Sequence, residues 1–211
     1  MSTGFPELID GYRRFRSTAW QQQRERWAAL REGQTPQVMV IACSDSRVDP
    51  SQIFDSLPGE MFVVRNVAAM VPPFETTGGH HGVSAAIEFA VTQLEVPEIV
   101  VLGHGACGGV QAALTQRFQA AAPGAGGFIA DWIDLLDDAR ERVLAAGLPE
   151  DRRGRALELE AVKVSLTNLR SFPFVTSREQ AGHLKLHGAY FAIADGILHI
   201  LDEGSGSFAP A

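Results

Sequence analysis

The chain alternates between short apolar runs and longer amphipathic stretches. Three of the runs have the length and the β-branched content of buried strands. They cover residues 37–42, 61–66 and 98–103. Nearly continuous apolar runs of this kind are typical of parallel strands that are covered on both faces. A later segment, residues 184–201, predicts two more strands that meet in a hairpin turn at Asp195-Gly196.

Amphipathic spacing predicts helices before, between and after these strands. Apolar residues from Phe5 onward recur at steps of three and four, and we expect one helix over residues 5–31. The same spacing predicts four further helices. They cover residues 82–94, 107–114, 128–146 and 156–171. The glycine-containing segments 123–127 and 203–211 are predicted to be flexible connections.

The order in which strands and helices alternate predicts an α/β fold. We expect a single domain over residues 1–211 with a mostly parallel, doubly wound sheet flanked by helices. A C-terminal antiparallel strand and an N-terminal helical arm, residues 1–35, complete the predicted architecture.

Composition narrows the possible partners. Of the 211 residues, 45% are hydrophobic and 20% are charged, which is ordinary for one globular domain. The formal net charge of -7 offers little to neutralise a phosphate backbone, so we expect no nucleic-acid partner. No apolar run approaches the roughly 20 residues of a membrane span, and the N-terminus lacks the apolar core of a signal peptide. We therefore expect a soluble, cytoplasmic protein without a membrane partner.

Two of the predicted strands lead into residues that bind metals. The run 37–42 continues into Cys43, and the run 98–103 continues into "GHGACGG", which places His104 and Cys107 three residues apart. Ligands of open parallel sheets bind beyond the carboxyl ends of the strands. If these strands are neighbours, the three side chains converge. Two thiolates and one imidazole form a known catalytic zinc set with an open fourth position.

The two cysteines have other interpretations as well. A structural disulfide is one, although disulfides are rare in a reducing cytosol. Two buried free thiols that serve only as small apolar side chains are another. A closed structural zinc site is disfavoured, because Cys43 and Cys107 are the only cysteines in the chain.

Asp45 and Arg47 follow Cys43 closely and predict a second element of the same site. A guanidinium that binds a carboxylate through two hydrogen bonds fixes its orientation and keeps it ionised. We expect Asp45 to act on a metal-bound water and Arg47 to act on Asp45. A structural pair that stabilises the loop is the alternative.

Two motifs together resemble the β-class carbonic anhydrases. They are "CSDSR" at 43–47 and "HGACGG" at 104–109. The stretches 59–68 and 82–91 between them are also similar to that family, so the resemblance covers most of the chain.

The resemblance implies a zinc enzyme that hydrates CO2 reversibly to bicarbonate and a proton. It implies that Cys43, His104 and Cys107 ligate one Zn2+ per subunit. It also implies that Asp45 and Arg47 form a catalytic dyad that orients a zinc-bound hydroxide. Members of the family form homodimers or larger assemblies of dimers, such as homotetramers, and their N-terminal helices pack on the neighbouring subunit.

The family has two active-site types, and the resemblance favours the plant-like one. The other type has a bicarbonate pocket built from a tryptophan, an arginine and a tyrosine. Arg65 matches the arginine, but the tryptophan and tyrosine positions hold Val40 and Phe191 here. The plant-like type binds CO2 with a glutamine, a phenylalanine, a valine and a tyrosine. The corresponding substrate-binding residues of this chain are Gln34, Phe62, Val67 and, in place of the tyrosine, Phe89.

His80 and His81 are candidates for a proton shuttle, because they follow two glycines and histidine titrates near neutral pH. Two other functions remain open on the same zinc scaffold. One is hydrolysis of CS2 or COS, which the ligand set does not distinguish from CO2 hydration. The other is a non-catalytic zinc-binding module, for which a paired Asp45 and Arg47 would not be needed.

Overall fold

A computed structural model describes residues 4–77 and 79–211 of the chain. The chain divides into two compact units, one that ends at Thr35 and one that covers Pro36–Ala211. None of the helices in these described residues combines the length and the apolar character that a membrane crossing needs.

The first unit contains three helices where one was predicted. They are α1 (Phe5–Ser17), α2 (Ala19–Gln22) and α3 (Arg24–Leu30). The prediction of one continuous helix is wrong because the backbone leaves the helical conformation at Thr18. The Thr18 hydroxyl donates to the carbonyl of Arg14, which also accepts the ordinary helical hydrogen bond from the Thr18 amide. Side-chain bonds of this kind destabilise and bend helices. Phe15 and Trp27 then pack edge to face, with ring centroids 6.0 Å apart.

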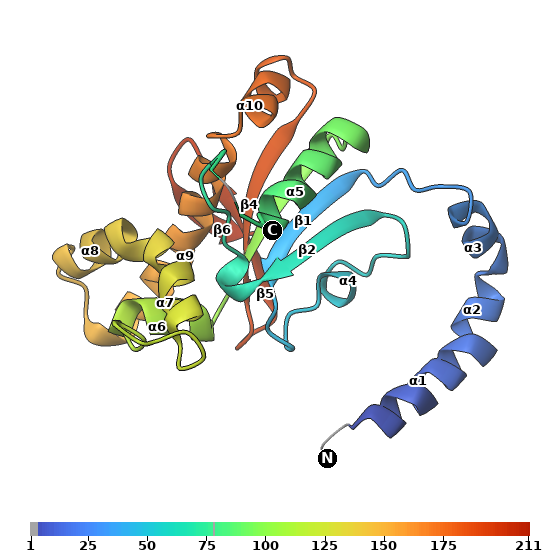
Figure 1. Ribbon diagram of the computed structural model, residues 1–211, viewed down its shortest axis with the longest axis horizontal. Helices are drawn as coiled ribbons and strands as arrows, with labels where there is room; N and C mark the ends of the chain where they lie inside the picture. The colour runs from blue at the N-terminus through green and yellow to red at the C-terminus, as the bar shows by residue number, and fades with distance from the viewer. Residues whose placement is uncertain (1–3, 78) are drawn as a thin grey trace. The chain divides into compact units, whose positions relative to one another are not determined.

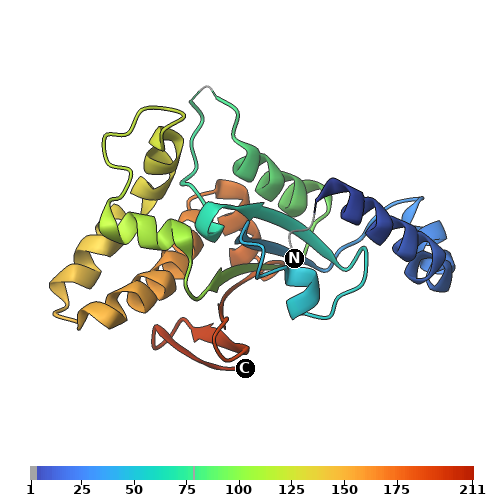
Figure 2. The ribbon, with the colours of Figure 1, turned by 90° about the horizontal axis from the view of Figure 1, so that it is seen from below.

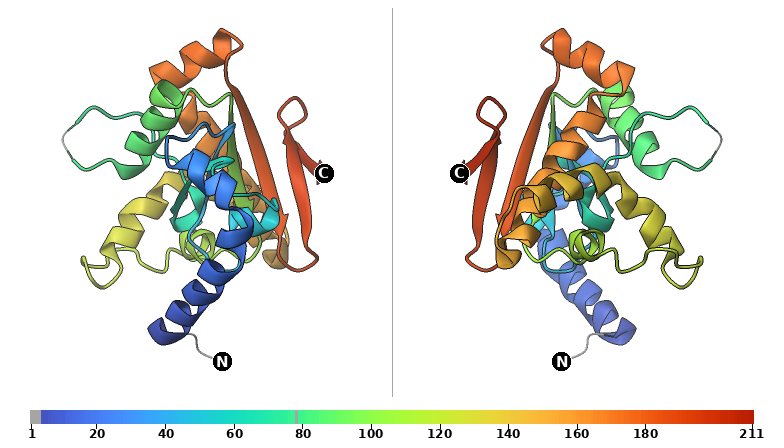
Figure 3. Two further views of the ribbon diagram at one scale, coloured as in Figure 1. Left: turned by 90° about the vertical axis from the view of Figure 1, so that its right-hand side faces the viewer. Right: turned by 90° about the vertical axis from the view of Figure 1, so that its left-hand side faces the viewer.

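The second unit is organised around a six-stranded sheet in the order β2-β1-β3-β4-β5-β6 (Figure 1). The strands are β1 (Val38–Cys43), β2 (Met61–Asn66), β3 (Glu98–His104), β4 (Lys185–Ala192), β5 (Ile197–Asp202) and β6 (Ser207–Pro210). The first four in the sheet order are parallel, and β5 and β6 extend the β4 edge in antiparallel fashion (Figure 3). The predicted α/β fold with a mostly parallel sheet is confirmed.

Strand β6 corrects one prediction, because it lies in the segment 203–211 that was expected to be a flexible connection. Asp202 accepts hydrogen bonds from the amide of Gly204 and the hydroxyl of Ser205, and these bonds close the turn that returns the chain to β5. The side chain of a turn aspartate therefore supplies the order that the composition did not predict.

The predicted helices of the second unit are found near their expected positions, but several of them differ from the predictions in length. They are α4 (Pro50–Ile53), α5 (Gly82–Glu88), α6 (Gly108–Thr115), α7 (Gly127–Ile133), α8 (Asp137–Ala145), α9 (Glu150–Leu169) and α10 (Pro173–Gln180). The predicted helix 128–146 is divided by a 3-10 turn, Asp134–Leu136, and the predicted helix 82–94 ends in a π-helical turn, Phe89–Gln93. Helix α9 starts six residues earlier than predicted, with Glu150 and Asp151 favourably placed in its first turn. Helices α4 and α10 were not predicted.

Helices α5, α9 and α10 cover one face of the sheet. Their apolar residues pack with Met39, Ile41 and Val101 of the strands in one buried cluster. The opposite face has a smaller cluster in which the end of α4 packs near Val40 and Leu102. Figure 2 shows α5 and α4 on opposite sides of the sheet. The strands are therefore covered on both faces, as their nearly continuous apolar runs predicted.

The order of the strands places a switch point between β1 and β3. The chain leaves β1 toward β2 on one side, and β3 pairs with β1 on the other side. At such a point the connections diverge and leave a crevice beyond the carboxyl ends of the two strands. Cys43 and His104 are the last residues of β1 and β3, so both lie at this crevice.

Candidate metal centre

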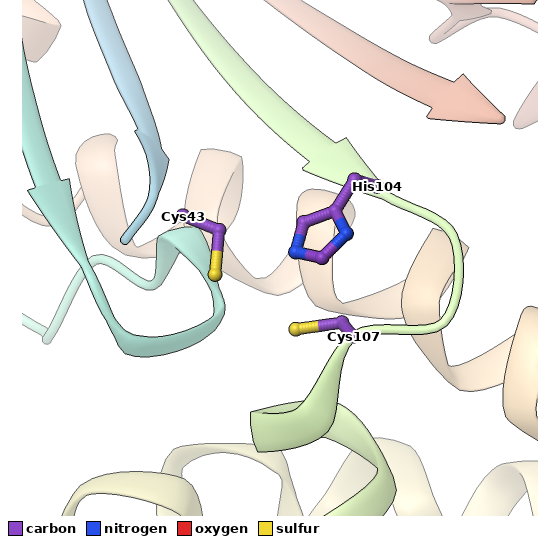
Figure 4. A group of neighbouring side chains, drawn as sticks. All are labelled: Cys43, His104 and Cys107. Carbon is purple, nitrogen blue, oxygen red and sulfur yellow. The ribbon is translucent and has the colours of Figure 1, made fainter. Parts of the chain in front are cut away.

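Cys43, His104 and Cys107 form a buried cluster of metal-binding side chains. Their candidate ligand atoms all lie within 4.8 Å of one another. Figure 4 shows the two sulfur atoms and the imidazole ring directed toward a common point. Both cysteines are free thiols, so the disulfide interpretation is excluded. Zinc bonds to sulfur and nitrogen are about 2.0 to 2.3 Å long, and a single ion can therefore be reached by all three atoms.

The imidazole of His104 is oriented for metal binding. Its Nδ1 lies 2.9 Å from the carbonyl oxygen of Gly105, which fixes the proton on Nδ1 and leaves Nε2 as the free lone pair. Within the described residues, Nε2 is buried and has no hydrogen-bond partner. A buried nitrogen without a partner beside two sulfur atoms fits a zinc ion, so the residues present match the metal that their types predict.

The turn that carries His104 and Cys107 is closely packed. A Cβ at Gly103 would lie 2.6 Å from Val162 of α9, and one at Gly109 would lie 2.7 Å from Val67. Neither distance is tolerable between carbon atoms, so both glycines are required for the approach of the backbone. Cys107 is the N-cap of α6, which confirms that the helix begins at this cysteine.

The sulfur of Cys43 is held from the opposite side by backbone amides. The amides of Asp45 and Ala68 donate to it and help to lower the pKa of Cys43. Ala68 has a left-handed backbone with φ of 64°, which is unfavourable for a residue with a Cβ. The side chain of Asn66 stabilises this bend, because its amide group binds both the N–H and the carbonyl of Met70.

The two sulfur atoms share one proton when no metal is present. A hydrogen bond from Cys107 is the largest influence that lowers the pKa of Cys43, to about 4. The same bond, with burial, raises the pKa of Cys107. Burial lowers the pKa of His104, but the nearby Cys43 thiolate outweighs this effect, and the net direction is upward. Cys107 thus holds a proton that a metal ion must displace when it binds.

Asp45 and Arg47 lie side by side at the edge of this cluster. The Arg47 Nε and Nη2 atoms donate to the two carboxylate oxygens of Asp45 at 2.9 and 2.7 Å, and the Arg47 amide donates to Oδ1 at 3.0 Å. The hydrogen bonds from Arg47 hold the pKa of Asp45 well below its usual range. Nη2 also donates to the carbonyl of Ala106 at 3.0 Å. Arg47 therefore joins the loop after Cys43 to the turn before Cys107.

Arg65 has a role that the sequence did not reveal. Its guanidinium donates to the carbonyls of Cys43 and Asp45 at 2.8 and 2.6 Å and to the carboxylate of Asp49 at 3.0 Å. These contacts fix the backbone that carries Cys43 and Asp45. The sequence shows only a charged residue near the end of an apolar strand, and these contacts depend on the pairing of β2 with β1, which local pattern does not reveal.

The structure places the predicted substrate-binding residues in different regions. Val67 follows β2 and approaches Gly109 in the first turn of α6. Phe62 and Phe89 stack with ring centroids 5.8 Å apart. Phe62 lies four residues before Asn66, the residue that pairs with Cys43, which is about 13 Å back along the strand. Gln34 belongs to the first unit.

The two histidines proposed for proton transfer lie in an exposed stretch before α5, although Gly78 of the same segment is outside the described residues. His80 is exposed. His81 is exposed as well, and its Nε2 lies 2.9 Å from the carbonyl of Thr77.

Comparison with known proteins agrees with the geometry of the site. Residues 38–198 match the family model described as "Carbonic anhydrase". The chain is 37% identical over 191 residues to beta carbonic anhydrase 3 of Arabidopsis thaliana, a match that covers 90% of this chain and 73% of the relative.

Solved structures with similar folds are also described as beta-carbonic anhydrases. The beta-carbonic anhydrase CcaA superposes with a TM-score of 0.89 at 32% identity, over 98% of this chain and 91% of that one. A structure of tetrameric beta-carbonic anhydrases from Sordaria macrospora superposes with a TM-score of 0.79 at 26% identity, over 97% and 98% of the two chains.

Zinc binding is expected to release protons and to strengthen as pH rises. Cys107 has a raised pKa, so at neutral pH it gives up its proton only when the metal binds. Each released proton makes the affinity rise about tenfold per pH unit. Titration calorimetry in buffers with different heats of ionisation counts these protons. An affinity independent of pH, with no proton released at pH 7, would contradict this account of the thiol pair.

Proposed function

Since this chain belongs to the β-class carbonic anhydrases, we propose that Asp45 and Arg47 direct the attack on CO2 within its metal centre. The chain is a zinc enzyme that hydrates CO2 reversibly to bicarbonate and a proton. When bound, zinc supplies the Lewis acidity that makes water a nucleophile near neutral pH.

The observation that carries this proposal is the pair of hydrogen bonds from Arg47 to Asp45. A carboxylate with a strongly lowered pKa stays ionised and accepts a hydrogen bond from the attacking water. That contact aims the lone pair of the water oxygen at the carbon of CO2. Arg47 keeps Asp45 in one orientation and also binds the carbonyl of Ala106, so the same guanidinium fixes the carboxylate relative to the turn that carries the ligand Cys107.

The CO2 pocket combines residues from two copies of the chain. CO2 is apolar, and a small apolar pocket suits it. Val67 lies beside the metal-binding turn, whereas the Phe62–Phe89 pair is about 13 Å back along β2 from the residue that pairs with Cys43. Phe89 is 45% exposed. The phenylalanine pair therefore serves the metal centre of a second copy, together with Gln34, in a plant-like site.

Assembly into homodimers or homotetramers is part of this proposal. A related β-carbonic anhydrase structure is described as tetrameric. Helix α1 has no buried residue, and Phe5, Leu8 and Tyr12 are each more than half exposed. Such an apolar helix face favours contact with another protein surface, and residues 1–35 act as an arm that packs on the neighbouring subunit.

His80 and His81 carry the product proton to buffer. Two points support this role: both side chains are exposed, and histidine as a residue type exchanges protons near neutral pH. The enzyme works in the cytoplasm, where reducing conditions keep Cys43 and Cys107 available as thiolates for the metal.

The Asp45→Asn variant is expected to keep zinc but to lose at least about 100-fold in CO2 hydration, because the neutral amide is a weaker hydrogen-bond acceptor than the carboxylate and orients the nucleophile poorly. Stopped-flow hydration and zinc content per chain measure the two effects. Asp131→Asn changes an exposed aspartate in the same way and serves as the control.

Normal turnover of Asp45→Asn would remove the proposed role of this carboxylate. The same assay on zinc-stripped protein should show no hydration. Release of sulfide from CS2 or COS, without hydration of CO2, would instead favour the hydrolase alternative.

Subunit mixing tests the shared pocket. Asp45→Asn damages the metal half of a site, and Phe89→Ala damages the apolar half. In hybrids of the two variants, one site combines both intact halves. Mixed and reassembled protein is therefore expected to be more active than the average of the two separate variants. Activity equal to that average would place the whole pocket in one chain.

The double variant His80→Ala/His81→Ala is expected to lower turnover several-fold in dilute buffer and to recover in concentrated imidazole, because an external base then takes the proton. His183→Ala, at another exposed histidine, is the control. Equal rates of the double variant and the unaltered enzyme in dilute buffer would exclude these histidines as the shuttle.

A further inference from the structure

Glu158 is a buried acid for which the mechanism above has no use. It lies on α9 and is only 7% exposed, on the helix face that also buries Leu157, Ala161 and Val162. A carboxylate in such a position is costly unless its oxygens are hydrogen-bonded. Its contacts therefore indicate what it does.

Both oxygens of Glu158 are bound, and each contact leads to the metal centre. Oε1 accepts a hydrogen bond from the backbone amide of the ligand Cys107 at 3.0 Å. Oε2 accepts a hydrogen bond from the hydroxyl of Tyr190 at 2.9 Å. None of the ion pairs found among the described residues involves Glu158. Its oxygens are directed to these two donors, so Glu158 is a neighbour of the cluster and not a ligand.

Tyr190 links Glu158 to the part of the turn that follows His104. Burial, followed by the charge of Glu158, raises the pKa of Tyr190 well above its usual range, so the hydroxyl remains a donor at all physiological pH values. A Cβ at Gly105 would lie 3.0 Å from this hydroxyl oxygen. The carbonyl of Gly105 in turn receives Nδ1 of His104. Glu158 and Tyr190 thus contact the turn directly behind both of its ligands.

The residue between these contacts needs external support. Ala106 has φ of 54°, in the left-handed region that a residue with a Cβ disfavours. Glu158 binds the amide of the next residue, Cys107, and Arg47 binds the carbonyl of Ala106 itself. The conformation of the turn is thereby fixed from its inner and its outer side.

The space behind the ligands is nearly closed. His104, Cys107, Val162 and Glu158 are among the residues that line a cavity of about 10 Å³. This volume is at or below the room that one water molecule needs. The hydrogen bonds of Glu158 therefore form without competition from bulk water, which makes them stronger and their loss more costly.

We propose that Glu158 is a positioning residue that sets the His104–Cys107 turn in its metal-binding shape before the metal arrives. Its carboxylate fixes the Cys107 amide on one oxygen and the Tyr190 hydroxyl on the other, and the turn between them presents the sulfur and the imidazole together. A site organised in advance binds its metal more tightly, because no ordering remains to be done at the moment of binding. The inference concerns metal binding alone and does not rest on the proposed role of Asp45.

The first test replaces Glu158 by glutamine, which has the same shape but no charge and only one acceptor oxygen. Glu158→Gln is expected to weaken zinc binding ten- to a hundredfold, the range found when partners of metal ligands are altered. Competition with a chromophoric chelator measures this affinity. Glu160→Gln is the matched control, because Glu160 is two residues away on α9 and pairs with Lys163 and Arg142 at the surface.

A spectroscopic readout separates positioning from general stability. Cobalt(II) in place of zinc gives a thiolate charge-transfer band whose energy and intensity follow the geometry of the sulfur ligands. The band is expected to shift in Glu158→Gln and to stay unchanged in Glu160→Gln. Circular dichroism of the metal-free proteins shows whether each variant is folded.

Tyr190→Phe keeps the test decisive if Glu158→Gln does not fold. It removes the hydroxyl that binds Glu158 and leaves the aromatic ring, and it is expected to weaken zinc binding at least threefold with a smaller shift of the cobalt band. Zinc affinity within twofold of the unaltered protein, with an unchanged cobalt band, in every folded variant of Glu158 and Tyr190 would overturn the proposal. Because no turnover is measured, this result is independent of any failure of the proposed catalytic dyad.

Discussion

The parallel pairing of β1 with β3 is the constraint on which the rest of the site depends. Parallel strands in register end at the same edge of the sheet, so the residues that end them become neighbours whatever their separation in sequence. Cys43 and His104 are 61 positions apart in numbering and meet for this reason alone. Because β2 departs on the other side of β1, nothing in the sheet occupies the space between the two strand ends. The strand order thus brings the ligands together, and their chemical types then decide that a metal can bind there.

The strand order does not determine the conformation of the loops that follow β1 and β3. Polar side chains stabilise these loops by hydrogen bonds to their backbone. Arg65 holds the carbonyls after β1, and Glu158 holds the amide of Cys107 after β3. Helix α9 contributes a second buried polar residue, Ser165, whose hydroxyl binds the backbone of Ala69 and Val71. Each of these side chains satisfies backbone groups that no strand or helix can reach. The two loops that shape the site are therefore stabilised from the sheet on one side and from α9 on the other.

The sequence was most informative where one physical signal dominated. Apolar runs predicted β1, β2 and β3 to within one residue, and the ends of two of these strands predicted the cluster of Cys43, His104 and Cys107. It was least informative where a single local bond decided the outcome. The hydroxyl of Thr18 interrupts the first helix and the carboxylate of Asp202 orders the last turn, and neither effect has a periodic signal. The contacts of Arg65 and Glu158 depend on which elements become neighbours, and this information is absent from local pattern.

The charges around the cluster explain why a cation is needed at its centre. Arg47 and Arg65, the two guanidinium groups that approach the ligand loop, use their hydrogen bonds on Asp45, Asp49 and backbone carbonyls. In the part of the chain that the structure describes, none of these bonds goes to a cysteine sulfur. The two sulfurs therefore depend on each other, and in the absence of metal one proton between them replaces the missing positive charge, which is why their pKa values move in opposite directions. A divalent ion replaces that proton and removes the need to keep one thiol neutral. Arg47 and Arg65 therefore orient Asp45 and the ligand loop, and the metal ion neutralises the two thiolates.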